Sequence, residues 1–139
     1  WKGRRMGTVA LMRAAKLMIS HDATVPASRI PDLVAHTHKV AREADLKVVI
    51  IGHAGDGNMH PIFLLDPSRD GEMKRFEQAS RELFRFTVEC GGTLSGEHGI
   101  GMEKNPYMGL QVEEVGMRTM RAVKKAMDPK GILNPGKFV

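Results

Sequence analysis

Two short apolar runs on either side of a glycine-rich segment form the clearest pattern in the chain. Residues 46–51 and 61–65 are β-branched or apolar almost throughout, and each run has the length of a strand. An Asp-Gly pair at 56–57 lies at the centre of the segment between them, where it is typical of a tight hairpin turn. With a two-residue turn there, His53 would lie directly opposite His60. We therefore expect a hairpin that places two imidazoles on one face of a sheet.

Apolar residues at helical spacing predict helices on both sides of this hairpin. They span about residues 1–17, 28–44, 71–90 and 112–127. We expect Ser28 to cap the second of these helices, and we expect short strands at 21–26 and 93–95. In the last helix the residues expected to face inward are Val115, Thr119, Met120, Val123 and Met127. Helices that alternate with strands in this way indicate an α+β domain, with a mainly antiparallel sheet backed by helices.

The composition is that of one globular domain or part of one. The chain has 139 residues, of which 42% are hydrophobic, and it begins at Trp1 rather than at a methionine, so we expect a fragment of a longer protein. The single cysteine, Cys90, excludes an intramolecular disulfide and fits a reducing compartment. No apolar run approaches the roughly 20 residues that a membrane-spanning helix needs. We therefore expect a cytoplasmic domain without a transmembrane segment.

The chain is basic, with 21 Lys and Arg residues against 16 Asp and Glu residues, which gives a net charge of +5. Such a balance would suit an anionic partner. Nucleic acid is a poor candidate, because the basic residues are scattered and only 5% of the residues are aromatic, too few for a base-stacking surface. A small anionic substrate or an acidic partner domain fits the charge at least as well.

The two histidines of the hairpin are candidate ligands of a divalent metal ion. Imidazoles need a carboxylate beside them and an open coordination position if the ion is to act on a substrate, and Glu97 could supply the carboxylate. This ligand set suits zinc, manganese, iron or cobalt alike. Gly96 and Gly99 would let the chain bend around Glu97, which leaves the neighbouring His98 free to act as a general base. The alternative is a glycine-rich hairpin whose histidines have no metal-binding role.

Three motifs in this order resemble the C-terminal part of the FAD-linked 2-hydroxyacid oxidases and dehydrogenases. They are residues 52–60 (GHAGDGNMH), 91–101 (GGTLSGEHGIG) and 128–137 (DPKGILNPGK). Within the vanillyl-alcohol-oxidase-like flavoprotein group, the chain is most similar to glycolate oxidase flavoprotein subunits and D-lactate dehydrogenases, and the similarity covers essentially the whole chain. The resemblance implies that residues 1–139 are a C-terminal FAD-linked oxidase domain with a ferredoxin-like cap fold. The family's N-terminal FAD-binding domain would lie outside this chain, which should not oxidise a substrate alone.

The resemblance also implies roles for individual residues. A divalent ion would bind the hydroxyl and carboxylate of a 2-hydroxy acid and lower the pKa of the hydroxyl. His98 would take the hydroxyl proton while hydride passes from the α-carbon to the flavin, which gives a 2-oxo acid. The implied metal ligands are His53, His60 and Glu97. The residues expected near the flavin ring are Asn134 and Lys137.

Substrate recognition is implied for Arg4 and, as a weaker candidate, Thr8, because the planar guanidinium group pairs well with a carboxylate. Members that act on longer dicarboxylates tend to carry a basic residue where Ser20 stands and a polar amide where Ile62 stands. The residues present here favour a small monoacid such as glycolate or lactate. The expected partners are this substrate and the FAD-binding domain of the same protein, with other oxidase subunits, a homodimer partner and a peripheral place at the inner membrane left open.

Two other functions stay open on the sequence. A metal-dependent hydrolase could use the same ion and His98 without a flavin, and it would be active as the isolated chain. A non-catalytic docking or assembly subunit would keep the motif residues for folding alone. In that case His53→Ala would lower stability and leave the complete enzyme active once folded.

Overall fold

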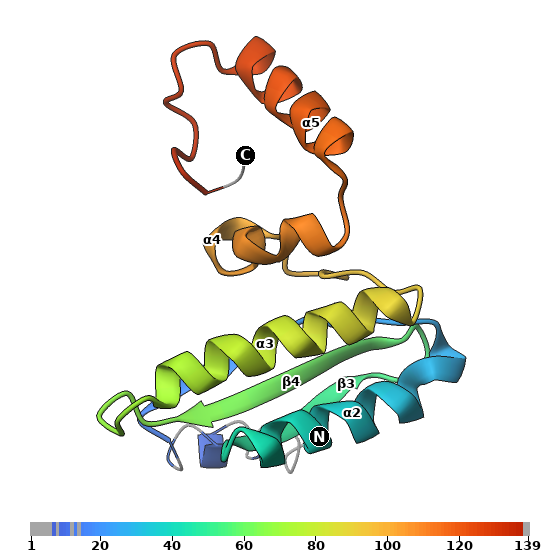
Figure 1. The fold of residues 1–139 in the computed structure, drawn as a ribbon, viewed down its shortest axis with the longest axis vertical. Helices are drawn as coiled ribbons and strands as arrows, with labels where there is room; N and C mark the ends of the chain where they lie inside the picture. The colour runs from blue at the N-terminus through green and yellow to red at the C-terminus, as the bar shows by residue number, and fades with distance from the viewer. Residues whose placement is uncertain (1–6, 8, 12, 14, 138–139) are drawn as a thin grey trace.

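The computed structural model describes residues 7, 9–11, 13 and 15–137. Residues 7, 9–11 and 13 are helical, as expected for the first helix, but its predicted end at residue 17 is wrong because a strand begins there. From there on the elements follow one another as Figure 1 shows. They are β1 (Leu17–Ser20), β2 (Ala23–Thr24), the 3-10 turn η1 (Ala27–Arg29), α2 (Ile30–Glu43), β3 (Lys47–His53), β4 (Asn58–Leu65), α3 (Glu72–Glu89), α4 (Gly101–Lys104), the 3-10 turn η2 (Asn105–Leu110) and α5 (Glu114–Met127).

The sheet is antiparallel, and β4 is its central strand. β3 pairs along one side of β4, and β1 and β2 pair along the other side. A single bridge between Thr24 and Thr93 adds one more piece, so the predicted strand at 93–95 is reduced to this bridge. With α2 and α3 as the two connecting helices, the chain follows the β-α-β-β-α-β order of ferredoxin-like folds. The predicted α+β class, with an antiparallel sheet backed by helices, is confirmed.

Helices α2 and α3 pack on the same face of the sheet. Side chains alternate between the two faces along a strand, and Met59, Phe63 and Leu65 of β4 belong to one buried cluster with residues of both helices. The even-numbered residues of β4, which include His60 and Ile62, therefore lie on the opposite face. The histidines of the hairpin are thus directed away from α2 and α3.

Helix α5 stands apart from the sheet and its two helices (Figure 1). A second buried cluster holds its first turns and η2 against α3. Four of the five residues predicted to face inward are exposed instead. They are Thr119, Val115 at 62%, Val123 at 55% and Met127 at 79%. The helical period correctly predicts a helix here, but it does not say what covers the apolar face. No helix in the described part of the chain is long and apolar enough to cross a membrane.

The start of α2 also differs from the prediction. Ser28 lies in η1, and α2 begins two residues later at Ile30 without a hydrogen bond from a side-chain cap. Pro31 in the first turn lacks an N–H group that would need a partner, which lessens the need for a cap.

The loop between β3 and β4 passes close to the segment after β2. The carbonyl of Gly57 accepts a hydrogen bond from the N–H of Val25 at 3.1 Å, and the φ angle of Gly57 is +84°. A Cβ atom at position 57 would lie 1.8 Å from the carbonyl oxygen of Val25. Only glycine fits this close approach in a left-handed conformation. The loop that separates the two histidines is therefore fixed by a backbone contact.

We expect Gly57→Ala to lower the free energy of unfolding by about 2 kcal/mol or more, because the left-handed conformation and the clash with Val25 both oppose a side chain. Gly55→Ala is the matched control in the same loop, since a Cβ there would meet no atom within 4 Å. Urea unfolding of both variants measures the difference. Equal effects of the two substitutions would contradict the close approach.

Candidate functional site

The β3–β4 hairpin brings His53 and His60 together on the face of the sheet away from the helices. Their ring centroids lie 5.4 Å apart, with the ring planes at 88°. The predicted direct opposition is wrong, because His53 pairs with Asn58 and Ile51 pairs with His60. The connecting loop has four residues, 54–57, rather than two. Since the pairing differs from the prediction by two residues, both imidazoles keep the same face and meet diagonally.

Glu97 lies beside both imidazoles. Its carboxylate oxygens lie 3.3 Å from Nε2 of His53 and 3.8 Å from Nε2 of His60. One donor atom from each of the three residues lies within 4.8 Å of the others. Two imidazole nitrogens and a carboxylate oxygen form a donor set that zinc and several other divalent transition metals accept. The three residues expected from the sequence to be metal ligands are therefore neighbours in space.

His60 is the most firmly held member of this group. Its side chain is 10% exposed, whereas the side chains of His53 and Glu97 are 43% and 49% exposed. Nδ1 of His60 lies 3.3 Å from the carbonyl oxygen of His21. A proton on Nδ1 would be donated to that carbonyl and would leave the lone pair on Nε2, which is the nitrogen that faces Glu97. The surroundings of His60 thus favour the tautomer that can bind a metal ion.

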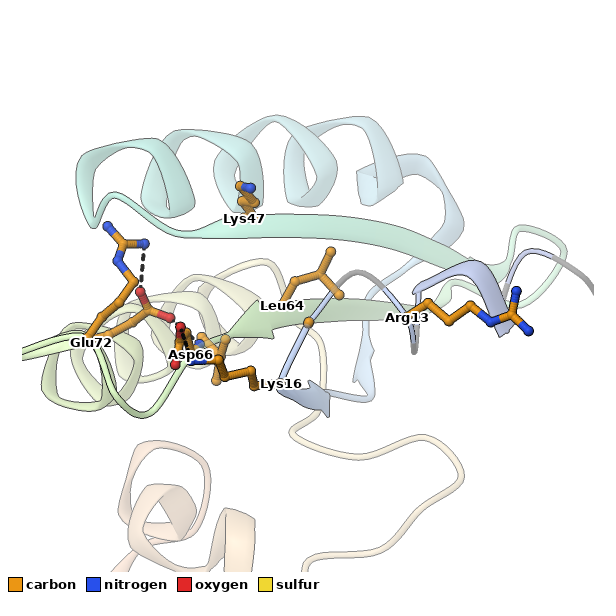
Figure 2. A pocket seen from close by; sticks show the side chains of 9 residues that line it. Arg13, Lys16, Lys47, Leu64, Asp66 and Glu72 are labelled. Carbon is orange, nitrogen blue, oxygen red and sulfur yellow. Dashed lines mark hydrogen bonds and ion pairs between the residues drawn. The ribbon is translucent and has the colours of Figure 1, made fainter.

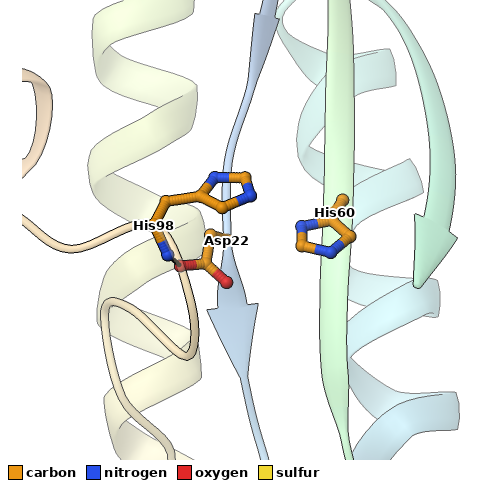
Figure 3. A group of neighbouring side chains, drawn as sticks. All are labelled: Asp22, His60 and His98. Atoms are coloured by element: carbon orange, nitrogen blue, oxygen red, sulfur yellow. Dashed lines mark hydrogen bonds between the residues drawn. The ribbon is translucent and has the colours of Figure 1, made fainter. Parts of the chain in front are cut away.

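His98 joins the group from the loop that follows Glu97. Its ring is parallel to that of His60 within 7°, with the centroids 5.0 Å apart. Figure 3 shows the two imidazoles in front of the strands, with the helices behind. His98 also lines a hollow of about 350 Å³, together with residues 99–104 and Lys137. An exposed imidazole therefore stands between the possible metal ligands and a space of the size of a small molecule.

Asp22 holds the loop that carries Glu97 and His98. Its Oδ2 atom accepts hydrogen bonds from three consecutive backbone N–H groups of residues 96–98, at 3.1, 3.0 and 2.8 Å. It also accepts from the hydroxyl of Ser95 at 2.6 Å and from Nζ of Lys104 at 3.1 Å. Burial alone would raise the pKa of Asp22, but these hydrogen bonds outweigh it and hold the pKa of the carboxyl group well below its usual range. Asp22 is therefore a carboxylate anion, and it is fully buried.

Sequence reasoning did not identify Asp22 as a site residue. The signal it carries is its place within the strand expected at 21–26, because a charged side chain in a buried strand needs partners. The sequence could not name these partners, since they follow 73 to 82 positions later in the chain. Only the folded chain brings them to one oxygen atom.

The other predicted site residues differ in what the structure shows of them. Lys137 lines the same hollow as His98. Asn134 is exposed with a φ angle of 49°, and it is not among the residues that line this hollow. Arg4 and Thr8, the predicted substrate-binding residues, lie outside the described residues.

A separate hollow of about 390 Å³ lies at the other end of β4 (Figure 2). Two of the ion pairs that line it join Lys16 to Asp66 at 2.9 Å and Arg69 to Glu72 at 2.8 Å. A strand rises about 3.3 Å per residue, which places this end roughly 20 Å from His60. These charges partner each other, and the hollow does not belong to the histidine site.

His21 lies buried behind the site, and its carbonyl is the one that Nδ1 of His60 faces. Nε2 of His21 lies 2.8 Å from the hydroxyl of Ser80. Burial, and next the positive charge of Lys104, lowers the pKa of His21 from 6.5 to about 4. The rings that surround it are those of Phe63, Phe76 and Phe84. His21 is therefore neutral at pH 7 and fills an aromatic part of the core.

A family model and several known proteins match this chain over nearly its whole length. The family model described as FAD linked oxidases, C-terminal domain, matches residues 1–138. The glycolate oxidase subunit GlcD of Bacillus subtilis is 43% identical over 137 residues, which cover 99% of this chain and 29% of the relative. A D-lactate dehydrogenase of Anaerostipes hadrus is 36% identical over 139 residues, 99% of this chain and 29% of the relative. A probable mitochondrial D-lactate dehydrogenase of Danio rerio is 34% identical over 141 residues, 100% of this chain and 28% of the relative. The chain thus spans less than a third of the length of these relatives.

We expect acid to destabilise the fold in the window set by His21. Between pH 6.5 and about 4 the unfolded chain binds a proton at this residue that the folded chain does not, so stability falls as the pH falls. The loss between pH 7.5 and 4.5 should be about 2 to 3 kcal/mol from this group. Urea unfolding at both pH values measures it. His21→Gln should remove this part of the pH dependence, and an unchanged difference between the two pH values would contradict the neutral, buried imidazole.

Proposed function

The chain belongs to the family of FAD-linked oxidase C-terminal domains, and from this membership we propose that it is the substrate- and metal-binding part of an FAD-linked oxidoreductase. The longer protein would oxidise a small 2-hydroxy acid to the 2-oxo acid by hydride transfer to the flavin. Relatives named glycolate oxidase subunit and D-lactate dehydrogenase support this reaction class. The observation that carries the proposal is the convergence of His53, His60 and Glu97 beside His98.

The donor set of this cluster fits a divalent transition metal. His60 offers Nε2 because its other nitrogen faces a carbonyl, and His53 and Glu97 can adjust because their side chains are about half exposed. Zinc, manganese and iron all accept two imidazoles and a carboxylate. A bound ion would supply a Lewis acid that lowers the pKa of a substrate hydroxyl. Glu97 lies against both imidazoles, so the proposed ligand side chains are close to one another.

His98 is the proposed general base. It lies next to Glu97 in the chain and 5.0 Å from the ring of His60, so a hydroxyl group near these side chains would be within its reach. Lys137 borders the same hollow and would place a positive charge near an anionic substrate or the flavin. Arg4 and Thr8 remain the proposed carboxylate-binding residues on the strength of the family resemblance.

The size of the substrate is proposed from the pair Ser20 and Ile62. These residues are direct partners across β1 and β4, and Ile62 lies two positions along β4 from His60, on the same face. A hydroxyl and a buried hydrocarbon at this pair suit a short substrate better than one with a second carboxylate. We therefore propose glycolate or lactate as the substrate type.

The flavin and its binding domain are proposed as partners within the longer protein. The bound flavin would supply the acceptor for the two electrons of the reaction. Within this chain Asn134 and Lys137 are the proposed flavin-proximal residues, and Lys137 has the added support that it borders the hollow beside His98.

We expect the full-length protein that carries this chain to hold about one divalent ion per chain, and the double variant His53→Ala/His60→Ala to lose it. His38→Ala is the control, because His38 is an exposed histidine of α2 on the other side of the sheet. Elemental analysis of the purified proteins measures the ion. A wild-type protein without metal, or a double variant that keeps it, would refute the metal site.

We expect His98→Gln in the full-length protein to lower kcat with glycolate or D-lactate by roughly 100-fold or more, the usual contribution of a general base, with the metal content unchanged. Turnover is measured with an artificial electron acceptor. Unchanged turnover would remove His98 from the mechanism. Activity of the chain without any flavin would instead indicate the hydrolase.

A further inference from the structure

The two oxygens of the Asp22 carboxylate have unequal surroundings. Oδ2 accepts all five of the hydrogen bonds described above, whereas Oδ1 is buried and has no hydrogen-bond partner among the described residues. In Figure 3 the oxygen that is not bonded to the loop points toward the side of His60. One oxygen of Asp22 lies within 4.8 Å of a ring nitrogen of His60 and of a ring nitrogen of His98. A buried carboxylate that served the fold alone would be expected to have partners on both oxygens.

The loop of residues 95–99 depends on this carboxylate for its shape. The amides of residues 96–98 donate to Asp22, and the amide of Gly99 donates to the hydroxyl of Ser95, which itself donates to Asp22. Every amide from 96 to 99 is thus tied to one oxygen directly or through one hydroxyl. Such a ring of N–H groups around an anion fixes the direction of the backbone, and with it the direction of the side chains it carries.

The loop also packs closely against strand β2. A Cβ atom at Gly96 would lie 2.2 Å from the hydroxyl oxygen of Thr24, so the loop rests directly on β2. The Asp22 carboxylate and this contact therefore act on the same stretch of backbone. The side chains of Glu97 and His98 are exposed, and the contacts described above join them to the hairpin histidines, so their position depends on the backbone that carries them.

We propose that Asp22 is the positioning residue of this site, whose Oδ2 atom holds the 95–99 loop so that Glu97 and His98 face the two hairpin histidines. The claim that this placement serves metal binding and catalysis rests on the proposed function. The hydrogen bonds to Asp22 do not depend on it. Lys104 has a different role, which is to balance charge. It is 3% exposed on α4, and its ammonium group balances the charge of the buried carboxylate without touching Glu97 or His98 in any hydrogen bond of the described residues.

The test distinguishes the positioning role of Asp22 from the charge-balancing role of Lys104, and it uses the full-length protein. Asp22→Asn would leave the charge of Lys104 buried and unpaired, which alone can unfold a protein. The double variant Asp22→Leu/Lys104→Met replaces the pair by apolar groups. Lys104→Met alone removes the counter-charge of the buried carboxylate, but the carboxylate keeps the four hydrogen bonds from Ser95 and the amides of residues 96–98, which satisfy the anion. Asp22→Glu keeps the charge but displaces the oxygens by one methylene group, and it decides the question if the double variant does not fold.

Two readouts are measured on each variant. Hydrogen exchange of the amides of residues 96–98, followed by mass spectrometry, should become roughly 10-fold faster or more in the double variant and in Asp22→Glu, and it should stay near the wild-type rate in Lys104→Met. The dissociation constant for Mn²⁺ should rise about 10- to 100-fold in the first two variants, the range seen when a residue that orients a metal ligand is lost.

Unchanged exchange and Mn²⁺ affinity in Asp22→Glu and the double variant would overturn the proposal, and so would an equal loss in Lys104→Met. A wrong proposed function would give a different experimental result. A wild-type protein that binds no Mn²⁺ or other divalent ion would refute the metal site, while the exchange of the 96–98 amides would still decide whether Asp22 positions the loop.

Discussion

The pairing register of β4 is the constraint on which both the core and the site depend. β4 is hydrogen-bonded on both sides, and its alternating side chains serve two purposes. Met59 and Phe63 are buried against the helices, and His60 and Ile62 face the other way. A slip of one residue would exchange the two sets, which would place an imidazole in the helical core and a phenylalanine where His60 or Ile62 now lies. The burial of the apolar face therefore holds His60 at the point where the other candidate site residues converge.

The region around the site contains polar atoms that are costly to bury. Five buried side-chain atoms have no hydrogen-bond partner in the described part of the chain, and three of these belong to His21, Asp22 and Asn58 in or next to the site. Most buried polar groups in proteins are paired, and an unpaired one lowers stability. Their concentration here indicates that this region is shaped for something other than stability. The apolar contacts on the opposite face of β4 offset that cost.

The sequence predicted the parts of the site that depend on local pattern. The Asp-Gly pair and the apolar runs located the hairpin, and the error of two residues in its register did no harm because it preserved the face of His53 and His60. Glycines around Glu97 indicated the second motif. Asp22 was beyond such reasoning, because its role comes from partners more than 70 positions away. For α5 the period predicted the helix and its apolar residues, but no periodicity contains information about what packs against them.

The burial of the metal-ligand candidates fits a site that a substrate approaches from one side. His60 is nearly covered and is held through its second nitrogen, so it can serve as a fixed ligand. His53 and Glu97 are about half exposed, and on their side an open coordination position would meet solvent. His98 is exposed beside His60, and it borders the hollow that Lys137 also lines. A base has to stand where the substrate hydroxyl arrives rather than behind the ion, and the order from buried ligand to exposed base satisfies that requirement.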